Sequence, residues 1–499
     1  MRFPSAGRLL LLFVCGLCAF GPTAAADTAD PDLARLRGAL IPKREVGADA
    51  FLRSLPAADG RGVVIGVFDT GVDPAALGLA VTTTGERKIV DIVDASGSGD
   101  VDTRTTRKPD ASGRLQGSSG RSLTLPDGLV NPSGEFRLGL KPASELFYGA
   151  VLRRVTERRA AARAAAASLA AAARANRPEA AALKAALAKA PDDRTRAERD
   201  RVARHQALQA LEEGKAGTDT GPLFDCVLWH DGSGWRVLVD TDEDGDLRNE
   251  RVLRPFGVAG EYASFGELPY THFGVQVYDE GRLLSIVTVS GDHGTHVASI
   301  AAGHDPADPS RNGIAPGARI FSVKIGDQRN GSSSALVSKL RAGGVLARHK
   351  VDILNVSYGA RSLLQDGREV SSRLYDALVE RYDVLVVMSA GNNGPALGTA
   401  GVPGAEASRV LGVGNYISAE MGPDLYGALH PVRAGALVTS SRGPTKDGDF
   451  GVDIMAPGAA IAAVSTETLH GAGLKNGTSM ASPSAAGVAA LVLSAARQA

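Results

Sequence analysis

The heptapeptide Gly477-Thr478-Ser479-Met480-Ala481-Ser482-Pro483 is the most informative stretch of this 499-residue chain. Its small residues form a turn that leads into residues 484–496, an Ala-, Gly- and Val-rich segment that predicts a buried helix. Ser479 therefore lies where a loop becomes a helix, beside unpaired N–H groups and the positive end of the helix dipole. A serine in this position is either a nucleophile or an ordinary N-cap residue, and its partners decide which.

Two earlier motifs contain the partners that a nucleophilic serine needs. His293-Gly294-Thr295-His296 opens an apolar helical segment, and Asp69-Thr70-Gly71 ends an apolar strand. His293 would accept the proton of the Ser479 hydroxyl, while Asp69 would orient the imidazole and stabilise its charged form. Asn392 follows another buried strand, so its side-chain amide can stabilise a developing oxyanion. These residue types together predict peptide-bond hydrolysis through an acyl-enzyme.

Three neighbouring residues compete for these roles. His296 lies three residues after His293 and faces the same side of the predicted helix, but His293 is closer to the loop. Asn393 adjoins Asn392 and competes for the oxyanion role. Asp73 offers a second carboxylate, although Gly71-Val72-Asp73-Pro74 is typical of a turn.

The second half of the chain alternates between strand and helix patterns. Strands are predicted at residues 320–323, 353–357, 384–388 and 410–413, and helices at 335–348 and 374–382. Such alternation predicts an α/β fold with a parallel sheet and helices on both of its faces. Ligands bind at the carboxyl ends of the strands in this architecture, which is where Asp69 and Asn392 fall.

Residues 85–290 form a predicted α+β insertion between Asp69 and His293. Its middle, residues 145–215, is rich in Ala, Arg and Glu without a wide apolar stripe, which predicts exposed helices and a projecting helical hairpin. Residues 222–290 are β-rich. The catalytic domain would then consist of residues 27–84 and 291–499.

An acidic loop at residues 240–246 imitates the first half of a calcium-binding EF-hand loop, with Gly245 at the sixth position. Arg251 occupies the twelfth position, where that loop needs a bidentate Glu. We therefore expect an acidic turn, and keep a structural calcium ion as the alternative. No other metal or cofactor is expected.

The composition and the N-terminal sequence indicate the partners and the cellular location to expect. Lys plus Arg equals Asp plus Glu at 55 each, which argues against nucleic acid as a partner. Residues 1–26 resemble a signal peptide, with Arg2 and Arg8 before a short apolar run and a small-residue cleavage site. We expect export to the periplasm or the exterior, without stable membrane insertion after cleavage. Cys226 would be the one remaining thiol, and its apolar neighbours predict a buried core residue.

The three motifs resemble those of the subtilases, in the subtilisin order Asp, His, Ser. They are residues 69–73, 293–298 and 477–483, and residues 390–392 resemble that family's oxyanion segment. The resemblance implies a subtilisin-like fold and a serine protease acting on polypeptides or oligopeptides, with Asp69, His293 and Ser479 as the triad and Asn392 as oxyanion donor. It also implies that Ser357, Tyr358, Gly359 and Gly391 contact substrate.

The long insertion resembles the tripeptidyl-peptidase II branch of that family. From Asp69 to His293 the chain advances 224 residues, against about 30 in subtilisin itself. Members of this branch that release tripeptides hold the substrate's amino terminus with two glutamates, whose positions here correspond to Ser334 and Ala360. Neither residue has a carboxylate that could form an ion pair with an ammonium group. We therefore favour internal cleavage over tripeptide release.

Two further possibilities stay open at this point. Only 20 residues follow Ser479, fewer than in the branch, so its large assemblies are not assumed and the chain could be an incomplete product. A non-catalytic protein with the subtilase fold is the alternative from another functional class. The presence of Asp69, His293, Ser479 and Asn392 together argues against it.

Overall fold

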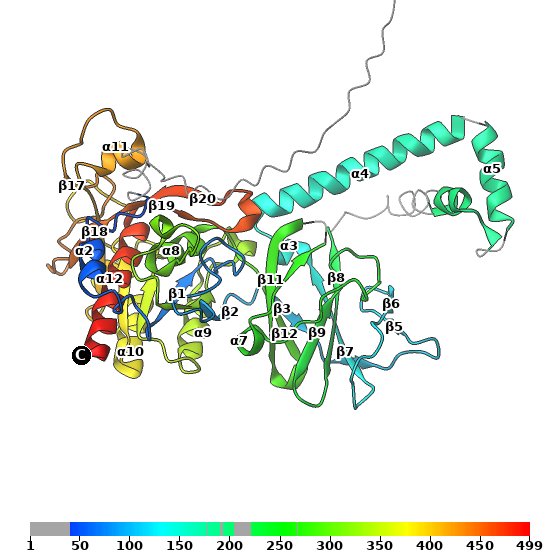
Figure 1. The fold of residues 1–499 in the computed structure, drawn as a ribbon, viewed down its shortest axis with the longest axis horizontal. Helices are drawn as coiled ribbons and strands as arrows, with labels where there is room; N and C mark the ends of the chain where they lie inside the picture. The colour runs from blue at the N-terminus through cyan, green and yellow to red at the C-terminus, as the bar shows by residue number, and fades with distance from the viewer. Residues whose placement is uncertain (1–39, 176, 190–192, 204–220, 267) are drawn as a thin grey trace, which may run out of the picture.

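The computed structural model describes residues 40–175, 177–189, 193–203, 221–266 and 268–499. The predicted signal peptide lies outside the described residues. So do residues 176, 190–192 and 204–215 of the predicted helical region. Figure 1 shows a body built around one large sheet, with the insertion beside it.

The central sheet has the strand order β17-β16-β15-β14-β1-β13-β2, and β18 pairs with β16. Its pairs are parallel except the edge pair β16–β17. The strands are β1 (Val64–Asp69), β2 (Ile89–Asp94), β13 (Arg319–Lys324), β14 (Ile353–Val356), β15 (Leu385–Ser389), β16 (Leu411–Ile417), β17 (Gly435–Ala436) and β18 (Ile454–Pro457). The parallel sheet predicted from the sequence is confirmed.

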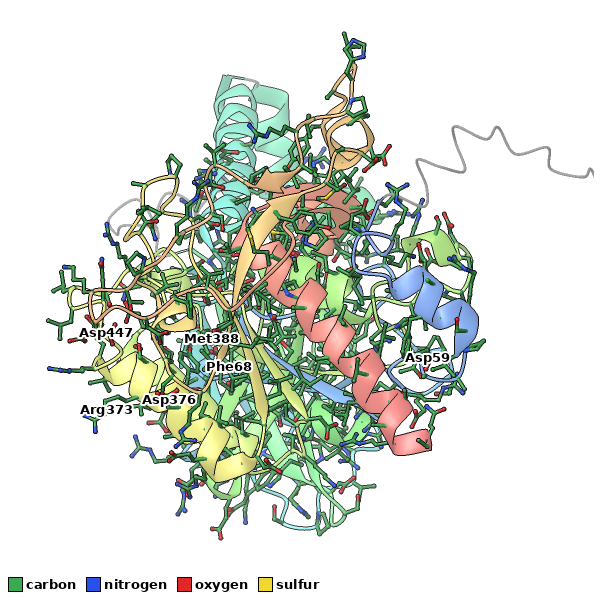
Figure 2. The ribbon with its side chains drawn as sticks, turned by 90° about the vertical axis from the view of Figure 1, so that its left-hand side faces the viewer. Asp59, Phe68, Arg373, Asp376, Met388 and Asp447 are labelled. Atoms are coloured by element: carbon green, nitrogen blue, oxygen red, sulfur yellow. The ribbon has the colours of Figure 1, made fainter. Side chains whose placement is uncertain are left out.

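Helices cover both faces of this sheet, because both faces of its strands are apolar. Ile65 and Val67 of β1 pack with α8 (His293–Ala302) and α12 (Thr478–Gln498). Phe68 packs on the other face with α9 (Leu336–Leu346) and α10 (Val370–Tyr382). Figure 2 shows α10 in yellow and α12 in red on opposite sides of the strands, with Phe68 and Met388 labelled. The apolar composition of α12 is thus that of a core helix.

Smaller elements complete the body. The predicted helix at residues 48–54 is present as α2 (Ala48–Ser54). A two-stranded hairpin, β19 (Ala459–Ala463) and β20 (Ala472–Asn476), leads directly into α12. The remaining described helix outside the insertion and longer than one turn is α11 (Met421–Tyr426).

The insertion contains two four-stranded antiparallel sheets, β4-β7-β8-β9 and β10-β11-β12-β3. A shared apolar core lies between them, and the hairpin β5–β6 covers the far face of the first sheet. The strands are β3 (Asp100–Asp102), β4 (Thr105–Arg107), β5 (Arg114–Gln116), β6 (Ser122–Thr124), β7 (Phe136–Pro142), β8 (Leu223–His230), β9 (Trp235–Val239), β10 (Ala263–Phe265), β11 (Leu268–Tyr278) and β12 (Leu283–Val287). Cys226 is buried in this core as a free thiol, as predicted.

The helices of the insertion include α3 (Ala143–Leu146), α4 (Gly149–Ala175), α5 (Arg177–Leu187) and α7 (Phe256–Ala259), and residues 196–203 are also helical. The start of α4 is anchored by Val151 and Val155, which pack in the insertion core. Beyond it, α4 runs outward from the body and α5 turns at its far end, so helices project from the body as the sequence predicts (Figure 1).

The insertion begins later than its predicted start at residue 85. Strand β2 pairs with β13 inside the central sheet, so only the chain after Asp94 leaves the body. The strand was misassigned because a buried edge strand and an insertion strand have the same apolar pattern. The insertion packs against this edge, where the Gln276 side-chain amide donates to Asp91 and to the Ile92 carbonyl.

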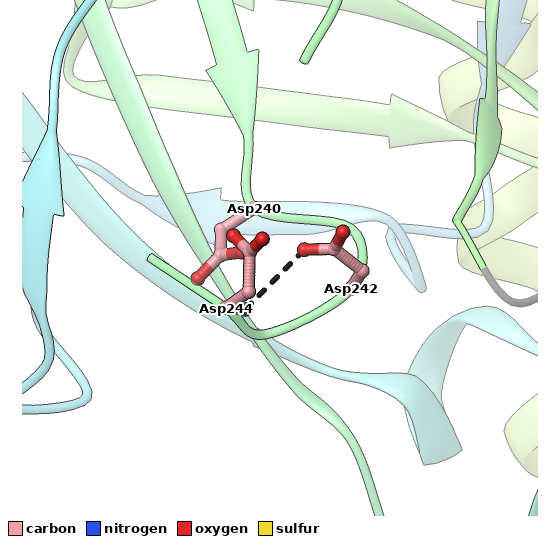
Figure 3. A group of neighbouring side chains, drawn as sticks. All are labelled: Asp240, Asp242 and Asp244. Carbon is pink, nitrogen blue, oxygen red and sulfur yellow. Dashed lines mark hydrogen bonds between the residues drawn. The ribbon is translucent and has the colours of Figure 1, made fainter. Parts of the chain in front are cut away.

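An arginine forms ion pairs with the acidic loop that follows β9. Ligand-type oxygens of Asp240, Asp242 and Asp244 lie within 4.8 Å of one another (Figure 3). The Arg121 guanidinium lies 3.0 Å from Asp240 and 3.1 Å from Glu243. Arg121 therefore offsets part of the negative charge of this turn.

Candidate active site

Asp69 and His293 meet at the carboxyl end of β1. The Asp69 carboxylate is fully buried, and its Oδ1 accepts a 2.8 Å hydrogen bond from His293 Nδ1. The same oxygen accepts a 2.7 Å bond from the Thr70 backbone N–H. Because Nδ1 is engaged with the carboxylate, His293 Nε2 is left to exchange a proton with a substrate or nucleophile.

A glycine makes this approach of helix to strand possible. A Cβ at Gly294 would lie 2.4 Å from the Gly71 carbonyl oxygen and 3.0 Å from Asp69 Cβ. The Thr70 hydroxyl accepts from the Gly294 N–H and donates to the Gly291 carbonyl, each at 2.8 Å. Thr70 thus links β1 to the start of α8, a role that sequence reasoning missed.

The electrostatic environment distinguishes the two histidines. Burial favours neutral His293, but the charge and hydrogen bond of Asp69 outweigh it and raise the pKa of His293. His296 is buried beside the backbone carbonyls of Ala460 and Gly473, and burial lowers its pKa to about 4. His296 is therefore a neutral core residue, and the geometry favours His293 as the base.

Ser479 is the second residue of α12, which begins at Thr478, six residues before the predicted helix of residues 484–496. Gly477 precedes it at φ 137°, and a Cβ there would lie 3.1 Å from the Asn392 amide nitrogen. The Ser479 hydroxyl donates to the Ser357 carbonyl at 3.2 Å. Within the described residues it makes no hydrogen bond with His293, so proton transfer requires the hydroxyl to rotate towards the imidazole.

The Asn392 amide is oriented by α12 itself. Its Oδ1 accepts from the Thr478 backbone N–H at 2.9 Å and from the Thr478 hydroxyl at 3.0 Å. The Thr478 hydroxyl in turn accepts from the Gly391 N–H at 3.2 Å. With its oxygen engaged at the start of the helix, Asn392 presents Nδ2 as a donor beside the nucleophile.

Replacing Asn392 with alanine is expected to lower kcat by about 10²- to 10³-fold with little change in KM, because this donor acts on the developing oxyanion. Steady-state kinetics on a chromogenic peptide measure the effect. Asn393→Ala is the matched control, since the Asn393 amide nitrogen lies only at 3.5 Å from the Ser441 hydroxyl. An equal loss of kcat in the two variants would show that the oxyanion role of Asn392 is wrongly assigned.

The predicted substrate-contact residues divide into two groups. Ser357 is buried, its carbonyl accepts from the Ser479 hydroxyl, and its own hydroxyl donates to the Ser479 carbonyl at 2.8 Å. Tyr358 lies edge-on to His293 with ring centroids 6.3 Å apart, and its hydroxyl donates to the Ser332 carbonyl. Ser357 and Tyr358 therefore contact the catalytic side chains, which leaves Gly359 as the exposed backbone of this segment.

Gly359 and Gly391 flank one apolar side chain. A Cβ at Gly359 would lie 3.6 Å from Val402 Cβ, and one at Gly391 would lie 3.2 Å from Val402 Cγ1. Val402 is buried and was not identified from the sequence. The backbone of both glycines therefore packs against Val402.

Asp73 is confirmed as part of a turn. Its Oδ1 accepts from the Ala75 N–H, and its Oδ2 accepts from the Thr466 N–H and hydroxyl. It thereby anchors the β19–β20 hairpin, which leads to Ser479.

The insertion touches the same hairpin through Glu467. The Tyr148 hydroxyl donates to Glu467 Oε1 at 3.1 Å, and Arg154 donates to the Glu467 carbonyl at 2.8 Å. Glu467 is 1% exposed, and burial, with the nearby Asp73, raises its pKa to about 7. A largely buried carboxyl thus joins the insertion to the loop before the nucleophile.

This raised pKa predicts a pH-dependent stability. Glu467 binds its proton more tightly in the folded than in the unfolded chain, so its favourable contribution is present below pH ~4.5 and lost as the pH rises through ~7. Glu467→Gln should therefore gain thermal stability relative to wild type at pH 8 but not at pH 5, by on the order of 3 kcal/mol at most. Exposed Glu380→Gln is the control, and an equal difference at both pH values would contradict the prediction.

Comparison with known proteins agrees with this geometry. The sequence profile of the Subtilase family matches residues 60–499. The chain is 43% identical over 465 residues to tripeptidyl-peptidase 2 of Arabidopsis thaliana, and 40% identical over 461 residues to that of Caenorhabditis elegans. These matches cover 91% and 92% of this chain but 33% of each relative, so the chain spans about a third of their length.

A solved structure extends the likeness to the insertion. The crystal structure of tripeptidyl peptidase 2 superposes with a TM-score of 0.65 and 28% identity, over 91% of this chain and 34% of that one. Sequence profile, relatives and fold agree over both the body and the insertion. The chain therefore belongs to the subtilase family.

Proposed function

We propose that Ser479, His293 and Asp69 hydrolyse peptide bonds as a catalytic triad. The 2.8 Å bond between buried Asp69 and His293 Nδ1 carries this proposal, because it leaves Nε2 as a base for the serine. Ser479 Oγ would attack the scissile carbonyl while its proton passes to Nε2, and Asn392 Nδ2 would stabilise the oxyanion. His293 would give this proton to the leaving amine. It would then take a proton from the water that attacks the acyl-enzyme, and return it to Ser479 Oγ as the acid is released.

The mode of cleavage that the comparisons favour is removal of tripeptides from free amino termini. The relatives named tripeptidyl-peptidase 2 match across more than nine-tenths of this chain, insertion included. This reverses the preference for internal cleavage drawn from the sequence. Oligopeptides with an accessible amino terminus would be its substrates.

Internal cleavage remains the second candidate because of two residues. Ser334 and Ala360, at the positions that correspond to amine-binding glutamates, contribute no carboxylate. Ala360 is exposed and Ser334 is partly exposed. Without paired carboxylates, a charged amino terminus forms no ion pair with the side chains at these two positions.

One peptide series separates the two modes. The chain is incubated with peptides of identical sequence whose amino termini are free or acetylated, and the products are identified by mass. Three-residue products from free peptides alone support tripeptide release. Cleavage of both forms at internal bonds supports an endopeptidase, whereas no cleavage of either form would contradict both. Ser334→Glu/Ala360→Glu is the matched variant, expected to increase the preference for free amino termini.

We further propose that the protein acts after export, on the basis of the signal-peptide pattern in residues 1–26. Fractionation of cells that produce the full chain tests this. Recovery of the unprocessed chain in the cytoplasm alone would contradict export.

A further inference from the structure

An ion pair joins the segments that carry His293 and Ser479. Lys475 Nζ lies 3.0 Å from Asp292 Oδ1 and 2.9 Å from Oδ2. Asp292 immediately precedes His293, and Lys475 lies near the end of β20, four residues before Ser479. The pair therefore bridges the N-terminus of α8, which begins with His293, and the strand β20 that leads to Ser479.

The local structure does not otherwise require these two charges. Asp292 occupies the N-cap position of α8, yet its side chain makes no capping hydrogen bond. Its carboxylate instead crosses to β20, 183 residues away along the chain. Both side chains are partly exposed, at 27% for Lys475 and 31% for Asp292, so an ordinary surface pair here would stabilise little.

We propose that Asp292 and Lys475 are positioning residues that balance the charge around His293 and tie its helix to the strand before Ser479. The proposal rests on the function proposed above, in which His293 is the catalytic base. Neither side chain is required to touch substrate or the reacting atoms.

The groups around His293 explain why such a balance matters. Asp69 lies against Nδ1, Tyr358 lies edge-on to the ring, and His296 follows on the same helix. Among the remaining charges, Asp292 raises the pKa of His293 and Lys475 lowers it. Because these effects oppose each other, the intact pair allows Asp69 to dominate, and loss of either partner exposes the charge of the other.

The pKa of His293 is measured directly by NMR titration of histidine-labelled protein and kinetically from the acid limb of kcat/KM. Lys475→Met should raise the apparent pKa by roughly half a unit, and Asp292→Asn should lower it by a similar amount. The double variant should return close to wild type. All shifts should shrink in 1 M salt, where the screening length falls to about 3 Å.

Two controls separate this effect from a loss of packing. Lys189→Met removes a lysine that pairs with Glu198 at 2.7 Å in the insertion, and should leave the pH profile unchanged. Lys475→Arg keeps the positive charge and should retain the wild-type pH profile. A merely structural pair would change stability or kcat without opposite shifts in pKa.

The outcomes are distinguishable from failure of the proposed function. Opposite shifts that cancel in the double variant support the pair, whereas absent shifts or shifts of the same sign overturn it. If the wild-type protein cleaves no peptide, the catalytic proposal fails, and the NMR titration still decides whether the pair acts on His293.

Discussion

Replacing Ser479 with alanine is expected to lower kcat/KM for peptide hydrolysis by about 10⁵-fold or more. In the proposed mechanism the Ser479 hydroxyl forms the acyl-enzyme, so residual activity of the variant would come from Asn392 and substrate binding alone. The fold should be unaffected, because the lost side-chain hydrogen bond is a single 3.2 Å contact with the Ser357 carbonyl.

Ser484→Ala is the matched control for this variant. Ser484 lies in the same helix, and its hydroxyl donates to the Met480 carbonyl at 3.0 Å, four residues earlier. Activity of both variants is measured on one peptide together with thermal unfolding. Full activity in Ser479→Ala would exclude Ser479 as the nucleophile.

Replacing Lys324 with methionine is expected to destabilise the protein by about 3–5 kcal/mol, which is the usual cost of breaking a buried ion pair. Lys324 Nζ lies 3.0 Å from Asp94 Oδ2, and both side chains are fully buried. The ammonium also donates to the Ser98 hydroxyl at 2.9 Å. Methionine fills similar volume but leaves the Asp94 carboxylate without its cation.

The ion pair of Lys324 and Asp94 lies at a junction between parts of the fold. Asp94 ends β2 and Lys324 ends β13, where the insertion leaves the central sheet beside Asp69. Denaturant unfolding compares Lys324→Met with Arg409→Met, which removes an exposed pair with Glu380 and should cost less than about 1 kcal/mol. Lys324→Met/Asp94→Asn should recover part of the loss, and equal costs for the two single variants would contradict the prediction.

The body of the fold could be predicted because its elements are long and apolar. Strands β1, β13, β14 and β15 and helices α8, α9 and α10 all appear near their predicted positions. Strands β3 to β6 were missed, since each has only three residues and contains too few apolar positions to show a period. The first residue of the insertion was misplaced for the related reason that β2 has no local feature marking its partner.

The candidate site was predictable as a set of residues but not as a set of contacts. Asp69, His293, Ser479 and Asn392 were identified from short motifs in a specific order. Ser357 was expected to bind substrate, but in the structure its carbonyl and hydroxyl both engage Ser479. That arrangement depends on how β14 and α12 pack, and no local pattern encodes it.

The sequence by itself determined which chemical groups this protein has and which architecture holds them, because hydrophobic period, turn residues and motif order are local properties of the chain. Only the tertiary structure decided that His293 rather than His296 meets Asp69, and that Thr478 orients Asn392. It also brought Lys475 to Asp292 and Glu467 to Tyr148, across 183 and 319 residues. Such pairs form because packing of the sheet, helices and insertion places distant side chains together, which residue preferences along the chain do not specify.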